Sequence, residues 1–365
     1  MTIRVMVLID TLATGGAESV AVELARGLDR RRFSPHVVVT RSSGPLEHRL
    51  RRAGIPVTVL GRRRRLSPSA YRRARDIARR SDLIHAHKFA SGVWGALLTR
   101  STGTPLIVHE HNWSDTPSAW RDLVIRHWTA PVTRRFLCVT AAVADQISAA
   151  APGGAVDGLA NPFAADEPLP RAEARRRLAV PGAGVIVGIV ARLRPEKNHE
   201  LLLRAVGRLL GAGHDLDLCI IGDGPRREHL TALAADLGIA ERVRWAGHVD
   251  DAGSLVSAFD VAVLCSRWEG LPLAALEAMH AGVPVVATAV GGLPDLVGGV
   301  GLLTDPDDVD GLATAIASLL EDPHLAARLS AAARQRVRER HDPAAVSRTV
   351  EQLYLQVAGA GMSTR

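Results

Sequence analysis

Short apolar runs typical of buried strands alternate with segments of helical periodicity along nearly the whole chain, in two successive series. Such alternation predicts parallel sheets with helices on both faces, because a parallel strand pair needs a long crossover connection. The first series predicts strands at residues 3–9, 36–40, 57–60, 83–87, 105–110 and 135–140. Helical spacing occupies residues 16–28 and 68–80 between these strands.

A break in this pattern marks a domain boundary. Residues 151–154 are Gly- and Pro-rich, and the Pro-rich connection after them continues neither strand nor helix. The second series predicts strands at residues 185–190, 216–221, 243–245, 261–264, 284–287 and 301–303, then helices to the end. A chain of 365 residues suits two α/β domains better than one. We place the domains at residues 1–165 and 166–342, and expect the last helix, residues 343–365, to pack back on the first domain.

The composition is that of a protein that folds in water. Hydrophobic residues make up 47% of the chain and charged residues 23%, and no apolar run reaches the roughly 18 residues that span a bilayer. The apolar segment 3–9 ends at Asp10 without a small-residue cleavage site, which predicts a strand and no secretion signal. Cys138, Cys219 and Cys265 lie apart in apolar runs without metal-ligand spacing. These features predict a cytoplasmic protein.

Positive charge is concentrated in one region. Between Arg41 and Arg80 there are thirteen arginines, including the run 62–65, against two carboxylates, in a chain of net charge +7. This region predicts either a solvated face or a peripheral contact with an anionic membrane. Nucleic acid is not expected as a partner, because the run has no interleaved aromatic residues and no binding motif.

The segment after the predicted strand 261–264 carries candidate chemistry. Glu269 follows the strand end and Glu277 lies within the next helix, so both carboxylates can accept hydrogen bonds from hydroxyl groups. Free N–H groups at the helix start form an anion site that suits phosphate. Pro272 has no N–H, so the expected donors are Leu271, Leu273 and Ala274. The competing interpretation is an ordinary capped helix with a glutamate in its first turn.

The wider sequence here, Ser266 to Pro272, then Leu276 to Met279 and Gly282 to Thr288, resembles that of retaining glycosyltransferases of family 4. The resemblance implies the GT-B fold, in which two Rossmann-like domains face each other across a cleft. It implies that Glu269, with Gly270 beside it, contacts the donor sugar. It also implies that Glu277 contacts the ribose of the nucleotide.

Three further segments of the second domain resemble that family. Arg192 and Lys197 match the diphosphate-binding turn, where cations stabilise a leaving nucleoside diphosphate; solvated loop charges are the alternative. Gly222 matches a strand-to-helix turn in which glycine allows a tight bend and a close approach. Val249 matches the segment whose backbone frames the base, and His248 before it has an exposed loop position as its alternative.

In the first domain, Thr14-Gly15-Gly16-Ala17-Glu18 resembles the glycine-rich loop near the donor phosphates and the acceptor. It lacks the Gly-x-Gly-x-x-Gly spacing of dinucleotide-binding proteins, which weakens the case for an unrelated nucleotide-dependent Rossmann enzyme such as a dehydrogenase.

Histidines follow two neighbouring strands of the same domain. We expect His109 and His111 to point to opposite faces, with His109 structural. The resemblance places His111 close to the transferred sugar. For His85 and His87 we favour packing in the core or at its rim. No metal site is expected, because no pattern such as His-Glu-x-x-His supports one.

The sequence therefore predicts a metal-independent hexosyltransferase without a cofactor that uses a nucleotide-diphosphate sugar. Its acceptor is expected to be a glycan or lipid-linked saccharide of cell-envelope polysaccharide or glycolipid synthesis, which Trp113, Trp120 and Trp128 favour if they are not core residues. The alternative is a non-catalytic sugar-nucleotide-binding regulatory protein of the same fold.

Overall fold

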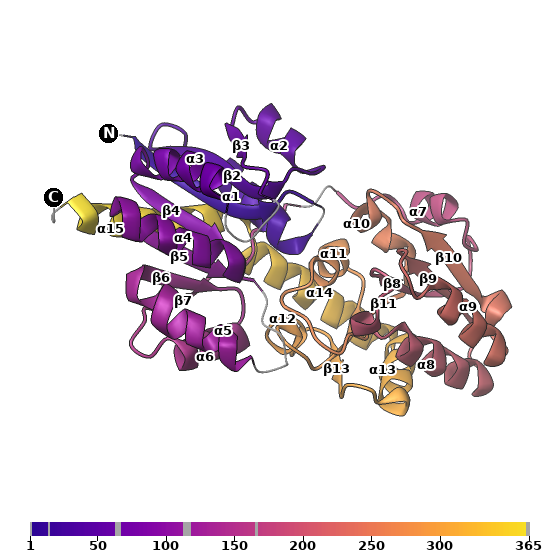
Figure 1. Ribbon diagram of the computed structural model, residues 1–365. Helices are drawn as coiled ribbons and strands as arrows, with labels where there is room; N and C mark the ends of the chain where they lie inside the picture. Colours follow the sequence, from indigo (N-terminus) through magenta and orange to yellow (C-terminus); the bar gives the residue numbers. More distant parts are fainter. Residues whose placement is uncertain (1, 14, 63–66, 112–117, 165–166, 363–365) are drawn as a thin grey trace. The chain divides into compact units, whose positions relative to one another are not determined.

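The computed structural model describes residues 2–13, 15–62, 67–111, 118–164 and 167–362 (Figure 1). The chain divides into two compact units, one formed by Met1–Ala164 with Arg340–Arg365 and the other by Ala165–Glu339. The final segment of the chain therefore belongs to the first unit. None of the described helices is long and apolar enough to cross a membrane.

The first unit contains a seven-stranded parallel sheet in the order β3-β2-β1-β4-β5-β6-β7. Its strands are β1 (Ile3–Thr11), β2 (Phe33–Ser42), β3 (Val57–Val59), β4 (Leu83–His87), β5 (Leu106–Glu110), β6 (Thr133–Cys138) and β7 (Val156–Gly158). The strand order reverses between β1 and β4, and this is where open α/β sheets present ligand sites. The short edge strand β7 was not predicted, because its three residues follow a Gly-rich break and carry little apolar pattern.

Both faces of this sheet are buried, as expected of parallel strands. Val5, Val7 and Ile9 of β1 belong to one core cluster, whereas Met6 and Leu8 belong to the cluster on the opposite face. The helical elements between the strands are α1 (Gly16–Gly27), α2 (Glu47–Arg52), α3 (Pro68–Arg79), α4 (Lys88–Thr102), α5 (Ala119–Val124), η1 (Ile125–Thr129), η2 (Ala130–Val132) and α6 (Ala141–Ala150).

Helix α15 (Pro343–Met362), drawn in yellow in Figure 1, completes the core of the first unit. Val346, Val350 and Tyr354 are buried in the same cluster as residues of α1 and β1. The Tyr354 ring meets Phe33 edge to face at 5.9 Å, and its hydroxyl lies 2.6 Å from His85 Nδ1. The first unit is thus built from both ends of the chain.

The second unit contains a six-stranded parallel sheet in the order β10-β9-β8-β11-β12-β13. Its strands are β8 (Val185–Val190), β9 (Leu216–Ile221), β10 (Val243–Gly247), β11 (Val261–Leu264), β12 (Val285–Thr288) and β13 (Leu302–Thr304). Its helical elements are α7 (Arg171–Leu178), η3 (Pro195–Lys197), α8 (His199–Gly211), α9 (Arg227–Asp236), η4 (Ala240–Arg242), α10 (Ala252–Leu255), η5 (Val256–Ala258), α11 (Leu273–Ala281), α12 (Leu293–Val297), α13 (Val309–Glu321) and α14 (Pro323–Arg340). The order reverses between β8 and β11, which pair directly. The prediction of two doubly wound parallel-sheet domains is confirmed.

Candidate functional site

The loops after β8 and β11 meet at the reversal point of the second sheet. The Lys197 ammonium donates a hydrogen bond to Glu269 Oε1, and Ser266 Oγ donates to the same oxygen at 2.7 Å. The Glu269 side chain is only 9% exposed and that of Lys197 is 25% exposed. The structure thus brings together two predicted donor-site residues, one from each strand at the reversal.

Backbone contacts fix the position of Glu269. Gly291 has φ of 54°, and a Cβ there would lie 1.7 Å from the Glu269 carbonyl oxygen. The next residue, Gly292, donates its N–H to the Gly270 carbonyl at 3.0 Å. Only glycine suits position 291, because it needs both a left-handed conformation and a close approach of two backbones. The glycine-rich loop after β12 therefore supports the loop that carries Glu269.

Helix α11 begins directly after Pro272 and has no side-chain cap. Within the described residues, the N–H groups of Leu271, Leu273 and Ala274 have no hydrogen-bond partner. Uncapped N–H groups and the positive end of the helix dipole attract anions. No side chain therefore caps this helix start, and the anion site stays a prediction.

Glu277 lies in the second turn of α11 and is half-buried. Burial, together with the nearby charge of Asp251, raises the pKa of its carboxyl to about 7. Gly253 of α10 faces this carboxyl, since a Cβ at Gly253 would lie 2.9 Å from Glu277 Cδ. Hydroxyl groups that donate hydrogen bonds to this carboxyl stabilise its ionised form.

The remaining predicted residues of the second unit lie in the loops after β8, β9 and β10. Arg192 is exposed between β8 and η3. Gly222 has φ of 144°, and a Cβ there would lie 1.9 Å from the Ala191 carbonyl oxygen, so the close approach that glycine allows here is to the adjacent loop. Val249 is half-buried after β10, whereas His248 is exposed beside Asp250.

In the first unit, Gly15 and Gly16 lie at the start of α1, after β1. A Cβ on Gly15 would lie 2.5 Å from Glu18 Oε2, so glycine leaves room for this buried carboxylate. The Lys88 ammonium donates to Glu18 Oε1, and Thr11 Oγ1 donates to the same oxygen at 3.2 Å. Lys88 itself has φ of 72°, a strained conformation for a residue with a side chain.

His111 belongs to a group of four buried histidines. Its Nε2 lies 2.9 Å from His87 Nδ1, and burial lowers its pKa to about 3, so its imidazole is neutral at pH 7. The expectation that His109 and His111 point to opposite faces is wrong, because their ring centroids lie 4.1 Å apart. Side chains two positions apart on a strand point to the same face, and His111, the first residue after β5, keeps this alternation.

Some predicted residues lie outside the described part of the chain. These are Thr14, Asn112, Trp113 and three arginines of the basic run, Arg63, Arg64 and Arg65. The first arginine of that run is described and is not a free surface charge. Arg62 Nη2 lies 2.9 Å from Asp10 Oδ1, Arg62 Nε donates to Thr40 Oγ1 at 3.0 Å, and the guanidinium lies 5.3 Å from the centre of the Trp94 ring.

Comparison with known proteins identifies the family. The family described as "Glycosyltransferase Family 4" matches residues 14–152, and that described as "Glycosyl transferases group 1" matches residues 170–336. A D-inositol 3-phosphate glycosyltransferase from Streptomyces griseus is 30% identical over 91% of this chain and 76% of its own length. This chain belongs to glycosyltransferase family 4.

Two further proteins are similar to this chain, one in sequence and one in fold. A 2-deoxystreptamine glucosyltransferase from Streptomyces kanamyceticus is 37% identical over 41% of this chain, and the match spans only 40% of that relative's length. The crystal structure of HepE from Anabaena in complex with UDP superposes with a TM-score of 0.85 and 24% identity, over 96% of this chain and 99% of that one. The fold of the glycosyltransferase is therefore GT-B.

Sequence reasoning missed the pair of Glu18 and Lys88 in this glycosyltransferase. One signal was available, since Lys88 and Lys197 are the only lysines of the chain. The structure places both of them at sheet reversal points, each paired with a glutamate from the other side of the reversal.

Proposed function

We propose that this glycosyltransferase transfers a hexose from a nucleotide-diphosphate sugar to an acceptor hydroxyl, with retention of configuration at the anomeric carbon. The pair formed by Lys197 and Glu269 carries this proposal, because it joins a cation and a carboxylate at the reversal point of the second sheet. Beside the pair, α11 offers N–H groups that suit phosphate.

We assign the diphosphate to the cations and the helix start. An ammonium group has three donors, so Lys197 can keep its bond to Glu269 while it donates to a phosphate oxygen. Arg192 and the N–H groups of Leu271, Leu273 and Ala274 add further donors for the negative charge that develops as the diphosphate leaves. With these groups in place, transfer is proposed to need no metal ion and no cofactor.

The sugar and the nucleoside are assigned to other residues. Glu269 orients the sugar hydroxyls, with Gly270 beside it, and Glu277 accepts hydrogen bonds from the ribose. The backbone at Val249 frames the base, and Gly222 holds the adjoining loop. In the first unit, Gly15 and Gly16 approach the donor phosphates.

We propose a front-face substitution, in which the leaving phosphate accepts the proton of the acceptor hydroxyl. The neutral His111 contributes a hydrogen bond to the transferred sugar, and no residue acts as a nucleophile. Retention rests on the family resemblance and not on any distance in the structure.

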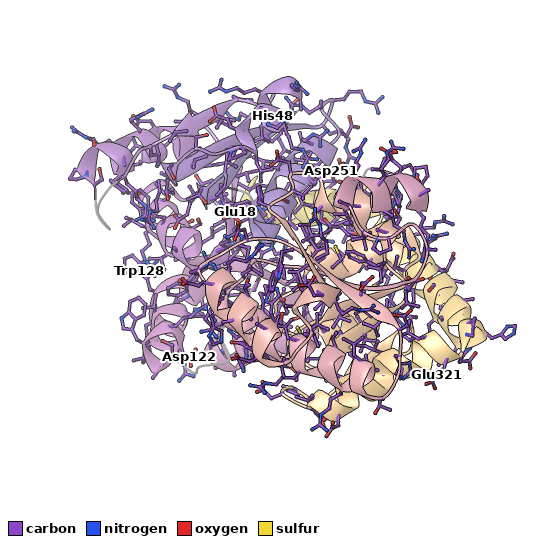
Figure 2. All side chains as sticks on the ribbon, turned by 90° about the vertical axis from the view of Figure 1, so that its right-hand side faces the viewer. Glu18, His48, Asp122, Trp128, Asp251 and Glu321 are labelled. Carbon is purple, nitrogen blue, oxygen red and sulfur yellow. The ribbon has the colours of Figure 1, made fainter. Side chains whose placement is uncertain are left out.

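We propose that the acceptor is a glycan or a lipid-linked saccharide of cell-envelope polysaccharide or glycolipid synthesis. Exposed aromatic side chains support a contact with membrane lipid. Trp120 is 60% exposed, and Trp128 is 37% exposed and projects from the surface (Figure 2). Arg100 lies 4.2 Å from the centre of the Trp128 ring, and tryptophan beside arginine suits the interface of an anionic bilayer.

The arginines between Arg41 and Arg80 form a second proposed membrane contact. Seven described arginines of this region are exposed, namely Arg41, Arg51, Arg52, Arg72, Arg73, Arg79 and Arg80. Sedimentation with vesicles of anionic lipid tests this part, and we expect binding that weakens with added salt. Equal binding to neutral vesicles would contradict an electrostatic contact.

Nucleotide-sugar turnover tests the proposal itself. The purified chain is incubated with UDP-, GDP- and ADP-sugars and an acceptor panel, and the released nucleoside diphosphate is measured. We expect Glu269→Gln and Lys197→Ala each to lower turnover by at least about 100-fold. Glu321→Gln, at an exposed position shown in Figure 2, should keep full activity.

A non-catalytic sugar-nucleotide-binding protein of the same fold predicts a different result. It would bind a sugar nucleotide, detected as a thermal shift, without releasing diphosphate under any condition. Full turnover in both the Glu269 and Lys197 variants would instead contradict the assigned site.

A further inference from the structure

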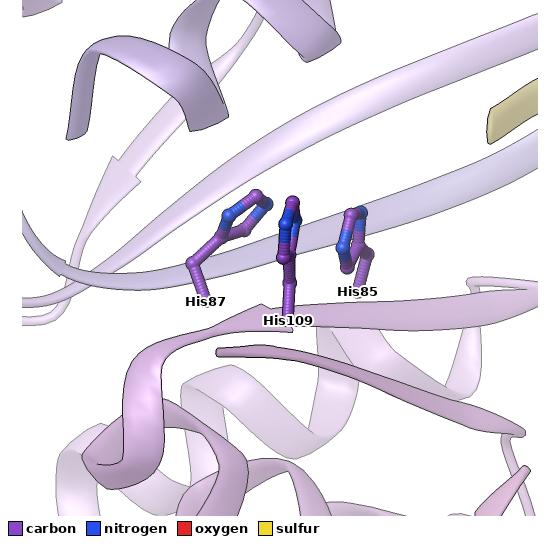
Figure 3. Close-up of side chains that lie close together, drawn as sticks. All are labelled: His85, His87 and His109. Atoms are coloured by element: carbon purple, nitrogen blue, oxygen red, sulfur yellow. The ribbon is translucent and has the colours of Figure 1, made fainter. Parts of the chain in front are cut away.

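Three buried histidines lie together on β4 and β5, next to the point where the strand order of the first sheet reverses. His85 and His87 lie on β4 and His109 lies on β5, where it is in register with His87. All three side chains are fully buried, and their rings project to the same side of the two strands (Figure 3). Two neighbouring strands thus present three imidazoles to one small volume.

Each of the three rings has a nitrogen without a partner. Among the described residues, His85 Nε2, His87 Nε2 and both ring nitrogens of His109 are buried and make no hydrogen bond. One nitrogen from each ring lies within 4.8 Å of the others. A buried polar atom without a partner destabilises a fold, so a cluster of such atoms indicates a bound species.

The hydrogen bonds of the rings suit metal binding. His85 Nδ1 is bonded to the Tyr354 hydroxyl and His87 Nδ1 to His111 Nε2. When Nδ1 of each ring donates in these bonds, its lone pair lies on Nε2, the nitrogen without a partner.

We propose that His85, His87 and His109 together bind one Zn²⁺ ion that stabilises the first unit. Three neutral imidazoles are a common ligand set for zinc, which leaves one coordination position for water or hydroxide. Lys88, which follows His87 in the chain, is paired with Glu18, and this pairing offsets its repulsion of the ion. This site goes beyond the transfer reaction, which we assign to other groups.

Metal content and X-ray absorption test the proposal on the full-length chain without an affinity tag. After growth in zinc-supplemented medium and extensive dialysis, we expect about one zinc per chain by elemental analysis. The absorption spectrum should show nitrogen neighbours at about 2.0–2.1 Å with the scattering pattern of three imidazoles. Zinc-free protein, also after refolding with zinc chloride, would overturn the proposal and leave water as the partner of the rings.

His109→Ala removes one ligand and should lower zinc to below about a tenth of an equivalent. The matched control is His199→Ala, because His199 is an equally buried histidine of the second unit with both ring nitrogens unpartnered. Its zinc content should equal that of the unmodified chain. Equal zinc in the His109 variant would overturn the proposal. If that variant does not fold, the absorption spectrum of the unmodified chain decides, since fewer than three imidazoles would also overturn it.

Discussion

At the scale of single residues, the chain uses lysine only where a compact cation meets a glutamate. Lys88 pairs with Glu18 in the first unit and Lys197 pairs with Glu269 in the second. A lysine ammonium is a point charge with three donors, whereas the arginine guanidinium is a planar fork. The two pairs therefore place similar charge arrangements at the reversal points of the two sheets.

The pair in the first unit leads to a prediction about the acceptor, because Glu18 belongs to the segment that resembles the glycine-rich loop near the donor phosphates and the acceptor. Replacing Lys88 by Ala should raise the acceptor KM about tenfold or more, because one hydrogen bond from a charged group contributes about 1.5–3 kcal/mol. The donor Kd should stay unchanged. Steady-state kinetics with Lys88→Ala and Lys88→Arg measure this, and the arginine variant should recover part of the loss. A change confined to donor affinity would contradict an acceptor role.

Glu277 leads to a prediction about pH. Its pKa of about 7 lies above the ordinary 4.5, so the carboxyl is largely protonated at pH 6 and ionised at pH 8. An ionised carboxylate accepts from both ribose hydroxyls, so nucleoside diphosphate should bind more tightly as pH rises from 6 to 8. Calorimetry measures how the affinity for nucleoside diphosphate changes with pH in the unmodified chain and in Glu277→Gln. Titration of the phosphate groups contributes equally to both slopes. Equal slopes would contradict the assignment.

The same shift affects stability in the absence of nucleotide. Because the folded pKa is raised, the stability that this group contributes is fully present below pH 4.5 and is lost as pH rises through about 7. Relative to Glu277→Gln, the unmodified chain should therefore lose stability as pH rises from about 4.5 to about 7, by at most about 3 kcal/mol, with no further loss above that pH.

At the scale of elements, the loops that follow the strands hold the site through backbone contacts. Gly291, in the loop after β12, lies against the Glu269 carbonyl, and Gly222, in the loop after β9, lies against the Ala191 carbonyl. Neither contact involves a side chain that could be recognised from residue type. Their effect is to fix loops from different strands in one arrangement.

Gly291→Ala should therefore destabilise the second unit and abolish turnover. A Cβ at this position would meet the Glu269 backbone, and overpacking typically costs about 1–3 kcal/mol in addition to the strain of a positive φ. Gly299→Ala is the matched control, since Gly299 has φ of 77° but no atom within 4 Å of an added Cβ. Thermal unfolding and nucleotide binding of both variants separate the steric effect of the added Cβ from the strain of the positive φ. Equal losses would show that backbone strain alone is responsible.

At the scale of the whole molecule, the end of the chain is part of the first unit. Helix α15 contributes Val350 and Tyr354 to its core, and the Tyr354 hydroxyl meets His85, which is 269 positions away. The first unit therefore cannot complete its core until the last helix has been made.

Tyr354→Phe should lower the stability of the first unit by about 1–3 kcal/mol, because His85 Nδ1 loses its partner while it stays buried. Leu355→Ala, at the neighbouring exposed position, should change little. Hydrogen exchange resolved along the chain measures this, and we expect faster exchange in β4 and α15 but not in the second unit. A uniform change in both units would contradict the assignment of α15 to the first.

Periodicity and composition determined the fold class of this protein, because a parallel strand buried on both faces must be apolar along its length. The strand starts and ends were predicted to within a few residues, except for β7, which is too short to carry a pattern. Local sequence also indicated Glu269, Glu277 and Lys197 as site residues, through resemblance to a family.

Only the tertiary structure decided which of these groups meet. Lys197 and Glu269 are 72 positions apart and Glu18 and Lys88 are 70 apart, and each pair forms because sheet order brings two strand ends together. The histidine cluster has the same origin, since strand register aligns His87 with His109. Sequence patterns report the environment of each residue along its own strand, whereas contacts between strands depend on sheet order and register, which have no local signal.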